Sequence, residues 1–356
     1  MRKRLLPTTI TPFISSALVV LGAFAVGAVF LVVVGKDPLT AYQLLVSRGI
    51  GSSFGVTETL IKMAPLLIVS AGLLIALKAS VWNIGIDGQF LLGAALVGIA
   101  APTLASSVPL IPMLVLSCVV GFIGGAFWGI IPALLKVRYG LNEIITTIMM
   151  NYVAIYLTSW MVKGPFKDPK TVPPQTTPIP LDFRFPHIPL TEVHVGLLVG
   201  LAAVVIVALL FSNTTIGFKL SVLGQNQRAA IHAGWPVGRL TVLAMLLSAG
   251  FAGLAGANDV LAVKGMFQGE WNPGYGLIGF ALVFLARLNS VWVIPFAYFF
   301  SFLLLGGEIM ARSAGIPVYF VQILEGLMLI FFAASIYVEH TYSERAHRRL
   351  PAQEGG

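Results

Sequence analysis

The sequence is short of charged residues and of cysteine, and each shortage excludes a class of protein. Only 10% of the 356 residues are charged, whereas 57% are hydrophobic. Soluble domains carry about 25% charged residues, so this composition excludes an ordinary soluble domain. The single cysteine, Cys118, cannot form an intrachain disulfide and offers no paired thiolates to a metal.

Motifs that bind nucleotide phosphates or catalytic zinc are also missing. The chain has no GxxxxGK(S/T) loop, so we expect that it does not hydrolyse ATP by itself. It has no HExxH motif, and its five histidines are scattered along the sequence. We therefore expect a protein that is not an enzyme and holds no metal or cofactor of its own.

Long apolar runs recur from one end of the chain to the other. A run of about 20 residues is what an α-helix needs to cross a bilayer. The first run, Phe13 to Val34, is too long for a signal-peptide core and lacks a small-residue cleavage site. We therefore predict an all-α, polytopic transmembrane bundle of eight to ten spans that forms a single domain over residues 1–356. The ten candidate spans are 13–34, 56–78, 87–105, 110–134, 143–162, 193–212, 239–258, 274–288, 291–311 and 317–337.

Basic residues orient these spans. Cytoplasmic loops carry an excess of Lys and Arg, and most of the 22 basic residues fall inside when the amino terminus is cytoplasmic. This orientation places both termini, the loop 212–239 and the tail 338–356 in the cytoplasm, and the loop 163–192 outside. The formal charge of +8 then reflects the inner membrane surface, and we expect no binding to nucleic acid.

The loop 163–192 is rich in proline. Its eight prolines prevent a regular helix and favour an extended, polyproline-like flap. Two interpretations stay open, a connector without a specific role and a docking surface for an external protein.

The loop 212–239 contains signals for one short helix. Asn226 is a good amino-terminal cap for a helix over Gln227 to Ala233, Gly234 can close it in a left-handed conformation, and Pro236 prevents its continuation. A helix of two turns is not stable alone in water, so we expect it to dock on another surface. The alternative is a solvated loop without a partner.

Polar residues interrupt the apolar pattern at WNIGIDGQ, residues 82–89. Two glycines lie within it, and Asn83, Asp87 and Gln89 bring two amides and a carboxylate to the edge of a predicted span. Such groups are tolerated at membrane depth only when they face protein or a water-filled path. The segment is therefore either a broken helix that lines a cavity or a turn between two spans.

Five further positions attract attention. Asn142 can cap the span that follows it, whereas Asn151 lies within that span and needs a partner on another helix or a solute. Glu270 and Trp271 lie in a glycine-rich segment that is a candidate for membrane re-entry. Glu325 lies in the last span, where we expect a hydrogen bond between helices.

Two segments of the chain are similar to each other. Residues 88–97, GQFLLGAALV, match residues 274–283, GYGLIGFALV, at six of ten positions. In the ten-span topology the two segments run in opposite directions, as an inverted repeat requires. Inverted repeats are typical of transporters.

Four motifs together resemble a known family. They are NIGIDGQ at 83–89, GLNEIITTIMMNY at 140–152, GQNQRAAIHAG at 224–234 and SAGFAGLAG at 248–256. They are similar to the permease subunits of bacterial ABC importers, in the superfamily of ribose and branched-chain amino acid permeases. The first two motifs resemble the branch that serves purine nucleosides with a basic-membrane-protein-type binding lipoprotein. In that branch a glutamate is more common at the position of Asp87.

The resemblance implies that the short helix is a coupling helix, which seats in a groove of an ATP-binding subunit. Small alanines would let it enter such a groove deeply. Arg228 and His232 occupy variable positions and can add contacts. The implied coupling residues are Gly224, Asn226, Arg228, Ala229, Ala230, His232, Ala233 and Gly234.

The resemblance also implies a mechanism. A cytosolic ABC ATPase binds ATP and Mg²⁺, a second homologous permease pairs with this chain as a heterodimer or homodimer, and an external lipoprotein delivers the solute. The chain would lie in the bacterial cytoplasmic (inner) membrane and translocate a purine nucleoside by alternating access. The expected pathway residues are Asn83, Asp87, Gln89, Asn151, Glu270 and Trp271.

Three alternatives stay open. The same amides would serve a simple sugar as solute. An ion-coupled secondary carrier would use Asp87 and Glu325 as coupling carboxylates. A membrane enzyme or scaffold would move no solute, and the sequence offers no compact catalytic set for the former.

Overall fold

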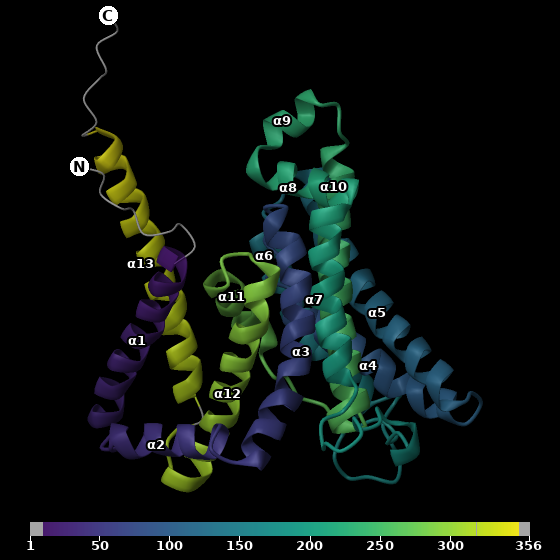
Figure 1. Ribbon diagram of the computed structural model, residues 1–356. Coiled ribbons are helices and arrows are strands. Elements are labelled where there is room, and N and C mark those ends of the chain that lie inside the picture. Colours follow the sequence, from purple (N-terminus) through teal and green to yellow (C-terminus); the bar gives the residue numbers. More distant parts are fainter. Residues whose placement is uncertain (1–9, 318, 349–356) are drawn as a thin grey trace, which may run out of the picture. The chain divides into compact units, whose positions relative to one another are not determined.

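The computed structural model describes residues 10–317 and 319–348 (Figure 1). These residues form helices and turns, and among them strand pairing is limited to two isolated β-bridges, which confirms the all-α prediction. The helices belong to two compact units, one comprising residues up to Gly49 and from Gly306 onward, the other Ile50–Leu305.

The larger unit contains most of the helices. They are α3 (Ser53–Lys78), α4 (Ile86–Ala105), α5 (Leu110–Tyr139), α6 (Glu143–Lys163), η1 (Leu181–Phe183), α7 (Gly196–Asn213), α8 (Thr215–Gln225), α9 (Gln227–His232), α10 (Val237–Asp259), the π-helical turn η2 (Val260–Lys264), α11 (Tyr275–Leu285) and the first part of α12 (Ser290–Ala314). The smaller unit contains α1 (Ile10–Val33), α2 (Pro38–Gly49), the end of α12 and α13 (Phe320–Arg348).

Eight of the described helices are long and apolar enough to cross a membrane. The other two predicted spans correspond to shorter apolar helices, Tyr275–Leu285 and Phe320–Ser335, so the count of ten is not confirmed. Helices α2 and α8 were not predicted. Helix α13 continues through 338–348 of the predicted tail, and residues 349–356 lie outside the described residues.

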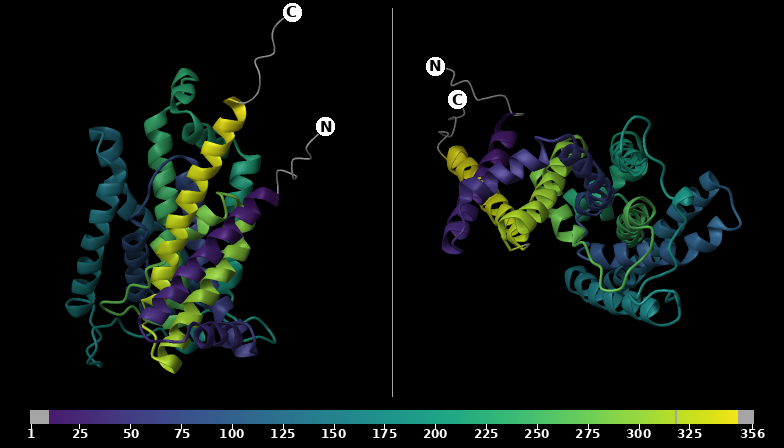
Figure 2. Two further views of the ribbon diagram at one scale, coloured as in Figure 1. Left: turned by 90° about the vertical axis from the view of Figure 1, so that its left-hand side faces the viewer. Right: turned by 90° about the horizontal axis from the view of Figure 1, so that it is seen from below.

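Helices α3, α4 and α10 form the core of the larger unit, since most of their residues are buried. Helices α5, α6 and α7 are mostly exposed. They lie at the periphery of this unit (Figure 2). We call the end that carries α9 the α9 end, and the opposite end, with the loop 163–192, the proline-rich end (Figure 1).

In the smaller unit, α13 packs against α1. Lys36 Nζ donates to the carbonyl of Ala314 at 2.8 Å, and the Tyr42 hydroxyl donates to the carbonyl of Phe24 at 2.7 Å. Glu325 is buried, and its Oε1 has no hydrogen bond within the described part of the chain. The predicted hydrogen bond between helices is therefore not found at that oxygen.

Glycines allow helices α4, α5 and α10 to approach closely. A Cβ on Gly125 of α5 would lie 2.2 Å from the carbonyl oxygen of Ala249, and one on Gly253 of α10 would lie 2.1 Å from that of Gly121. A Cβ on Gly93 of α4 would lie 2.5 Å from Gly253 Cα. Backbone contact of this kind is how small residues hold helices together in a membrane.

This packing predicts that Gly253→Ala destabilises the protein, although alanine is the better helix former. Overpacking of a tight core costs about 1–3 kcal/mol, which we expect as a lower midpoint of unfolding in a detergent titration. Gly326→Ala is the matched control, because no atom of the described residues lies within 4 Å of the added Cβ. Equal midpoints for the two variants would contradict the role of Gly253.

Candidate functional site

The segment 79–85 joins α3 to α4 at the α9 end. Helix α3 stops because Ser80 takes a left-handed conformation, with φ of 56°. The amide of Ser80 donates to the carbonyl of Leu77 and that of Val81 to Ala76, which is the hydrogen-bond pattern of a Schellman cap. Residue 83 is therefore outside a helix, and Asn83 and Asp87 do not share one helix face as they would in a continuous helix.

Asn83 and Gln89 form a reciprocal amide pair across this break. Asn83 Nδ2 donates to Gln89 Oε1 at 2.8 Å, and Gln89 Nε2 donates to Asn83 Oδ1 at 2.9 Å. Asn83 Nδ2 also donates to Ser248 Oγ of α10, and its Oδ1 accepts from the Gly85 amide. Asn83 is 0% exposed and Gln89 1%. The pair thus satisfies the two amides inside the protein.

Helix α6 also binds the segment 79–85, through two of its side chains. Asn151 Nδ2 donates to the carbonyl of Ile84, and its Oδ1 accepts from the Gly88 amide, both at 2.8 Å. Thr147 Oγ1 accepts from the Ile84 amide. Asn151 therefore has the partner on another element that its position required. Asn142 caps α6 as predicted, by accepting from the Ile144 amide.

Asp87 connects α4 to α11, the short helix that follows the irregular segment 265–274. Its Oδ1 accepts from the Gly276 amide at 2.8 Å, in the first turn of α11. A carboxylate is favourable there because helix amino termini carry unpaired amides and positive dipole. A Cβ on Gly276 would lie 2.9 Å from Asp87 Oδ1, so this close approach requires glycine.

The two similar segments of the sequence run antiparallel. Tyr275 packs beside Phe90, whereas Phe280 and Phe284, later in α11, pack beside Trp82, earlier than Phe90. The beginning of each helix follows an irregular segment, 79–85 before α4 and 265–274 before α11. This arrangement is the one that an inverted repeat requires.

Aromatic side chains extend the site away from Asp87. The Phe90 ring makes edge contacts with Trp271 and Tyr275, at centroid distances of 5.6 and 5.5 Å, and Trp271 also contacts Phe267. Lys264 Nζ lies 5.2 Å above the Trp271 ring. Trp271 is partly exposed, while Phe90 and Phe267 are buried.

The structure thus gathers five of the six predicted pathway residues, Asn83, Asp87, Gln89, Asn151 and Trp271, around one helix break. Glu270 does not join them, because it forms an ion pair with Lys163 and its side chain is 74% exposed. Sequence reasoning missed Thr147, Ser248 and Gly276, although the first two lie inside the quoted motifs. Whether any of these side chains contacts a solute stays a prediction.

The short helix of the loop 212–239 forms as predicted. Asn226 caps α9 by accepting from the Ala229 amide at 3.0 Å. Gly234 is left-handed, with φ of 72°, and the amides of Gly234 and Trp235 donate to Ile231 and Ala230 in a Schellman cap. The loop also contains α8, so the prediction of a single helix there was wrong.

One face of α9 is exposed and the other packs on the protein. Arg228, Ala229, His232 and Ala233 are exposed. Ala230, by contrast, is 0% exposed, so it cannot belong to the surface that α9 presents. Trp235 follows α9 and packs against Phe218 and Lys219 of α8.

Gly224 places the end of α8 directly on the helix break. A Cβ at Gly224 would lie 2.0 Å from the carbonyl oxygen of Lys78, the last residue of α3, and 3.1 Å from the carbonyl carbon of Ala79. Only glycine permits this backbone contact. The end of α8 is therefore in contact with the segment 79–85 that carries Asn83.

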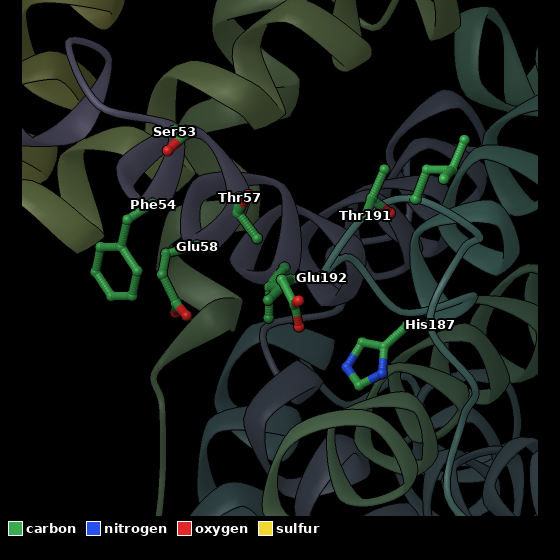
Figure 3. A pocket seen from close by; sticks show the side chains of 9 residues that line it. Ser53, Phe54, Thr57, Glu58, His187, Thr191 and Glu192 are labelled. Atoms are coloured by element: carbon green, nitrogen blue, oxygen red, sulfur yellow. The ribbon is translucent and has the colours of Figure 1, made fainter.

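A pocket lies at the proline-rich end, between the start of α3 and the segment 187–192 (Figure 3). Its volume is about 710 Å³. Glu58, Glu192 and His187 line it together with hydroxyl and apolar side chains, and Leu190, which has φ of 66°, is fully exposed on it. The pocket is separate from the helix break, which lies toward the α9 end.

Comparison with known proteins gives one family. The sequence profile described as "Branched-chain amino acid transport system / permease component" matches residues 55–333. A glucose ABC transporter permease of Haloferax volcanii is 34% identical, over 89% of this chain and 86% of its own. A nucleoside ABC transporter permease of Lactococcus lactis is 30% identical (89% of each chain), and a guanosine ABC transporter permease of Bacillus subtilis 31% (89% and 91%).

The amide pair predicts a non-additive double-mutant cycle. Asn83→Leu and Gln89→Met each leave one buried amide without its partner, at a cost of about 1–3 kcal/mol. The double variant removes both amides and is expected to lose less stability than the sum of the two single losses. Detergent unfolding midpoints of the four proteins measure this, and strictly additive losses would mean that the pair is not coupled.

Proposed function

The chain belongs to the family of permease components of branched-chain amino acid transport systems, and from this premise we propose that it imports a purine nucleoside by alternating access. Its relatives are permease subunits of ABC transporters, in which a separate subunit is the ATPase. The permease role therefore needs an ATPase and a substrate-binding protein beside this chain. We further propose a second homologous permease, a lipoprotein as the binding protein, and the bacterial inner membrane as the location.

Helix α9 is the proposed contact with the ATPase, and its geometry supports this role. Both ends of α9 are closed by caps, which fix the residues at which the helix begins and ends. Exposed Ala229 and Ala233 offer a small-residue surface, and exposed Ile231 adds an apolar side chain that a groove would bury. This capped helix with an exposed small-residue face is the observation that carries the proposed coupling role.

Movement of α9 would reach the helix break through the end of α8, which directly precedes α9. Gly224 of α8 touches the carbonyl of Lys78, and the next residues lead to the Asn83–Gln89 pair. Gln89 lies in α4, and Asp87 of the same helix holds the start of α11. A displacement of α9 would therefore move α4 relative to α11. Each of these two helices begins after an irregular segment, and alternating access is expected to act at such interrupted helices.

A purine nucleoside suits the groups around the break. Partly exposed Trp271 and its aromatic neighbours can stack on a base, and the partly exposed Asp87 carboxylate can hydrogen-bond a ribose. Two of the relatives are named for nucleosides. A simple sugar is the second candidate, since another relative is named for glucose.

Competition for uptake separates the two solutes. In membrane vesicles that contain this chain with its ATPase and binding protein, unlabelled guanosine is expected to reduce uptake of labelled adenosine at least tenfold, and glucose is not. Strong competition by glucose alone would favour the sugar. Uptake that proceeds without the ATPase and stops with an uncoupler would identify an ion-coupled carrier instead.

Substitution of the exposed face of α9 tests coupling. Ala229→Glu is expected to abolish co-purification of the ATPase and to reduce uptake more than tenfold, because it places a bulky charge on the proposed contact. Ala230→Glu is unsuitable, since burial of that carboxylate would disrupt α9 itself. The matched control is Thr215→Glu, which adds the same charge to an exposed position in the first turn of α8, where a carboxylate is favourable. Normal uptake by Ala229→Glu would refute the coupling role.

A further inference from the structure

The side chains of His194 and Asn258 are polar and buried, and they make no hydrogen bond within the described part of the chain. Their side chains are 2% and 0% exposed. Neither ring nitrogen of His194 and neither amide atom of Asn258 has a partner within the described part of the chain. Buried polar groups are almost always paired with protein or with water, so four unpaired atoms at one place need an explanation.

The two side chains meet at the first residue of α7. A Cβ on Gly196 would lie 2.3 Å from Asn258 Oδ1 and 2.6 Å from His194 Nδ1, so both atoms converge on one point. Asn258 comes from the last turn of α10, and His194 comes from the segment that precedes α7. Two atoms this close to one position are near enough to each other for a single water molecule to hydrogen-bond to both.

His194 ends a hairpin that reaches the pocket of Figure 3. The Ile188 amide donates to the carbonyl of Val193 at 2.7 Å, the Val195 amide donates to that of Pro186 at 2.9 Å, and His187 pairs with His194 in a β-bridge. The tip of this hairpin, Leu190 to Glu192, lines the pocket. Whatever joins His194 to Asn258 thus attaches the hairpin to α10.

We propose that a buried water molecule bridges His194 and Asn258 and anchors the hairpin 186–195 to α10. A water molecule donates to the Asn258 carbonyl oxygen and exchanges a second hydrogen bond with an imidazole nitrogen. Burial, and secondarily the proximity of His187, lowers the pKa of His194 to about 4, so at neutral pH the ring is uncharged and offers one donor and one acceptor. A polar site with several such partners is what a buried water requires.

A metal ion does not fit the same place. The described residues contain no group of three His, Cys, Asp or Glu side chains that could hold one. Asn258 and a single histidine provide too few ligands for a stable metal site. The remaining alternative is a direct hydrogen bond between the two side chains in a dry contact, and the experiment below separates it from the water bridge.

X-ray radiolysis of the full-length protein in detergent tests the bridge, because radicals formed from a bound water oxidise the buried side chain beside it. His194 is expected to be oxidised by X-ray pulses but not by radicals generated chemically in bulk solvent. Exposed His187 is the internal control and is oxidised in both experiments. Asn258→Leu is expected to lower radiolytic oxidation of His194 at least fivefold and leave that of His187 unchanged.

Two results would overturn the proposal. Absence of His194 oxidation in the wild-type protein under X-rays would indicate a dry, direct contact. Oxidation of His194 by bulk radicals at the rate of His187 would indicate a site open to solvent. Both are measured on the unaltered protein, so the test stands even if Asn258→Leu fails to fold, and Asn258→Ser, which keeps one polar atom, then serves as the second variant with intermediate oxidation.

Discussion

Polar groups inside an apolar bundle must find partners within the protein, and the structure of this chain depends on how it meets that requirement at one helix break. Between α3 and α4 the backbone leaves the helix, which frees amides and carbonyls that lipid cannot satisfy. Asn83, Thr147 and Asn151 satisfy these backbone groups with their side chains, and Gln89 of α4 and Ser248 of α10 in turn pair with the Asn83 amide. Helices α6 and α10 therefore hold the helix break in a defined conformation.

The same helix break connects the proposed solute pathway with the helices next to the proposed ATPase contact. Asp87, four residues after Asn83, holds the start of the discontinuous helix α11, and Gly224 brings the end of α8 against the last residue of α3. The small-residue packing of α4, α5 and α10 gives the helix break a stiff support, because backbones in direct contact leave little room to adjust. The core is tightly packed, and its one polar helix break lies between α9, the proposed contact with the ATPase, and α11. This arrangement suits a permease that an external ATPase drives.

Much of this could be predicted from single residues with strong local preferences. Asn226 and Gly234 define α9 through their caps, and Asn142 defines the start of α6, because these signals act over one turn. Helix α8 was missed because its polar and glycine residues resemble a loop, and only its packing through Leu220 and Leu223 identifies it as a docked helix. Ser248 as a partner of Asn83, and the partners of Asn151 and Asp87, lie 63 to 189 residues away in sequence, which no local pattern reports. The burial of Ala230 likewise follows from packing on neighbouring helices.

The contact between Gly224 and Lys78 is the central claim of the account, and the solute transported per ATP hydrolysed tests it most directly. The complex of this chain with its ATPase and binding protein would be reconstituted in proteoliposomes with either Gly224 or the Gly224→Ala variant. If the contact transmits movement, the variant assembles and hydrolyses ATP but moves at least fivefold less solute for each ATP. An unchanged ratio in an assembled Gly224→Ala complex would contradict the account, because the helix break would then respond to the ATPase by another route.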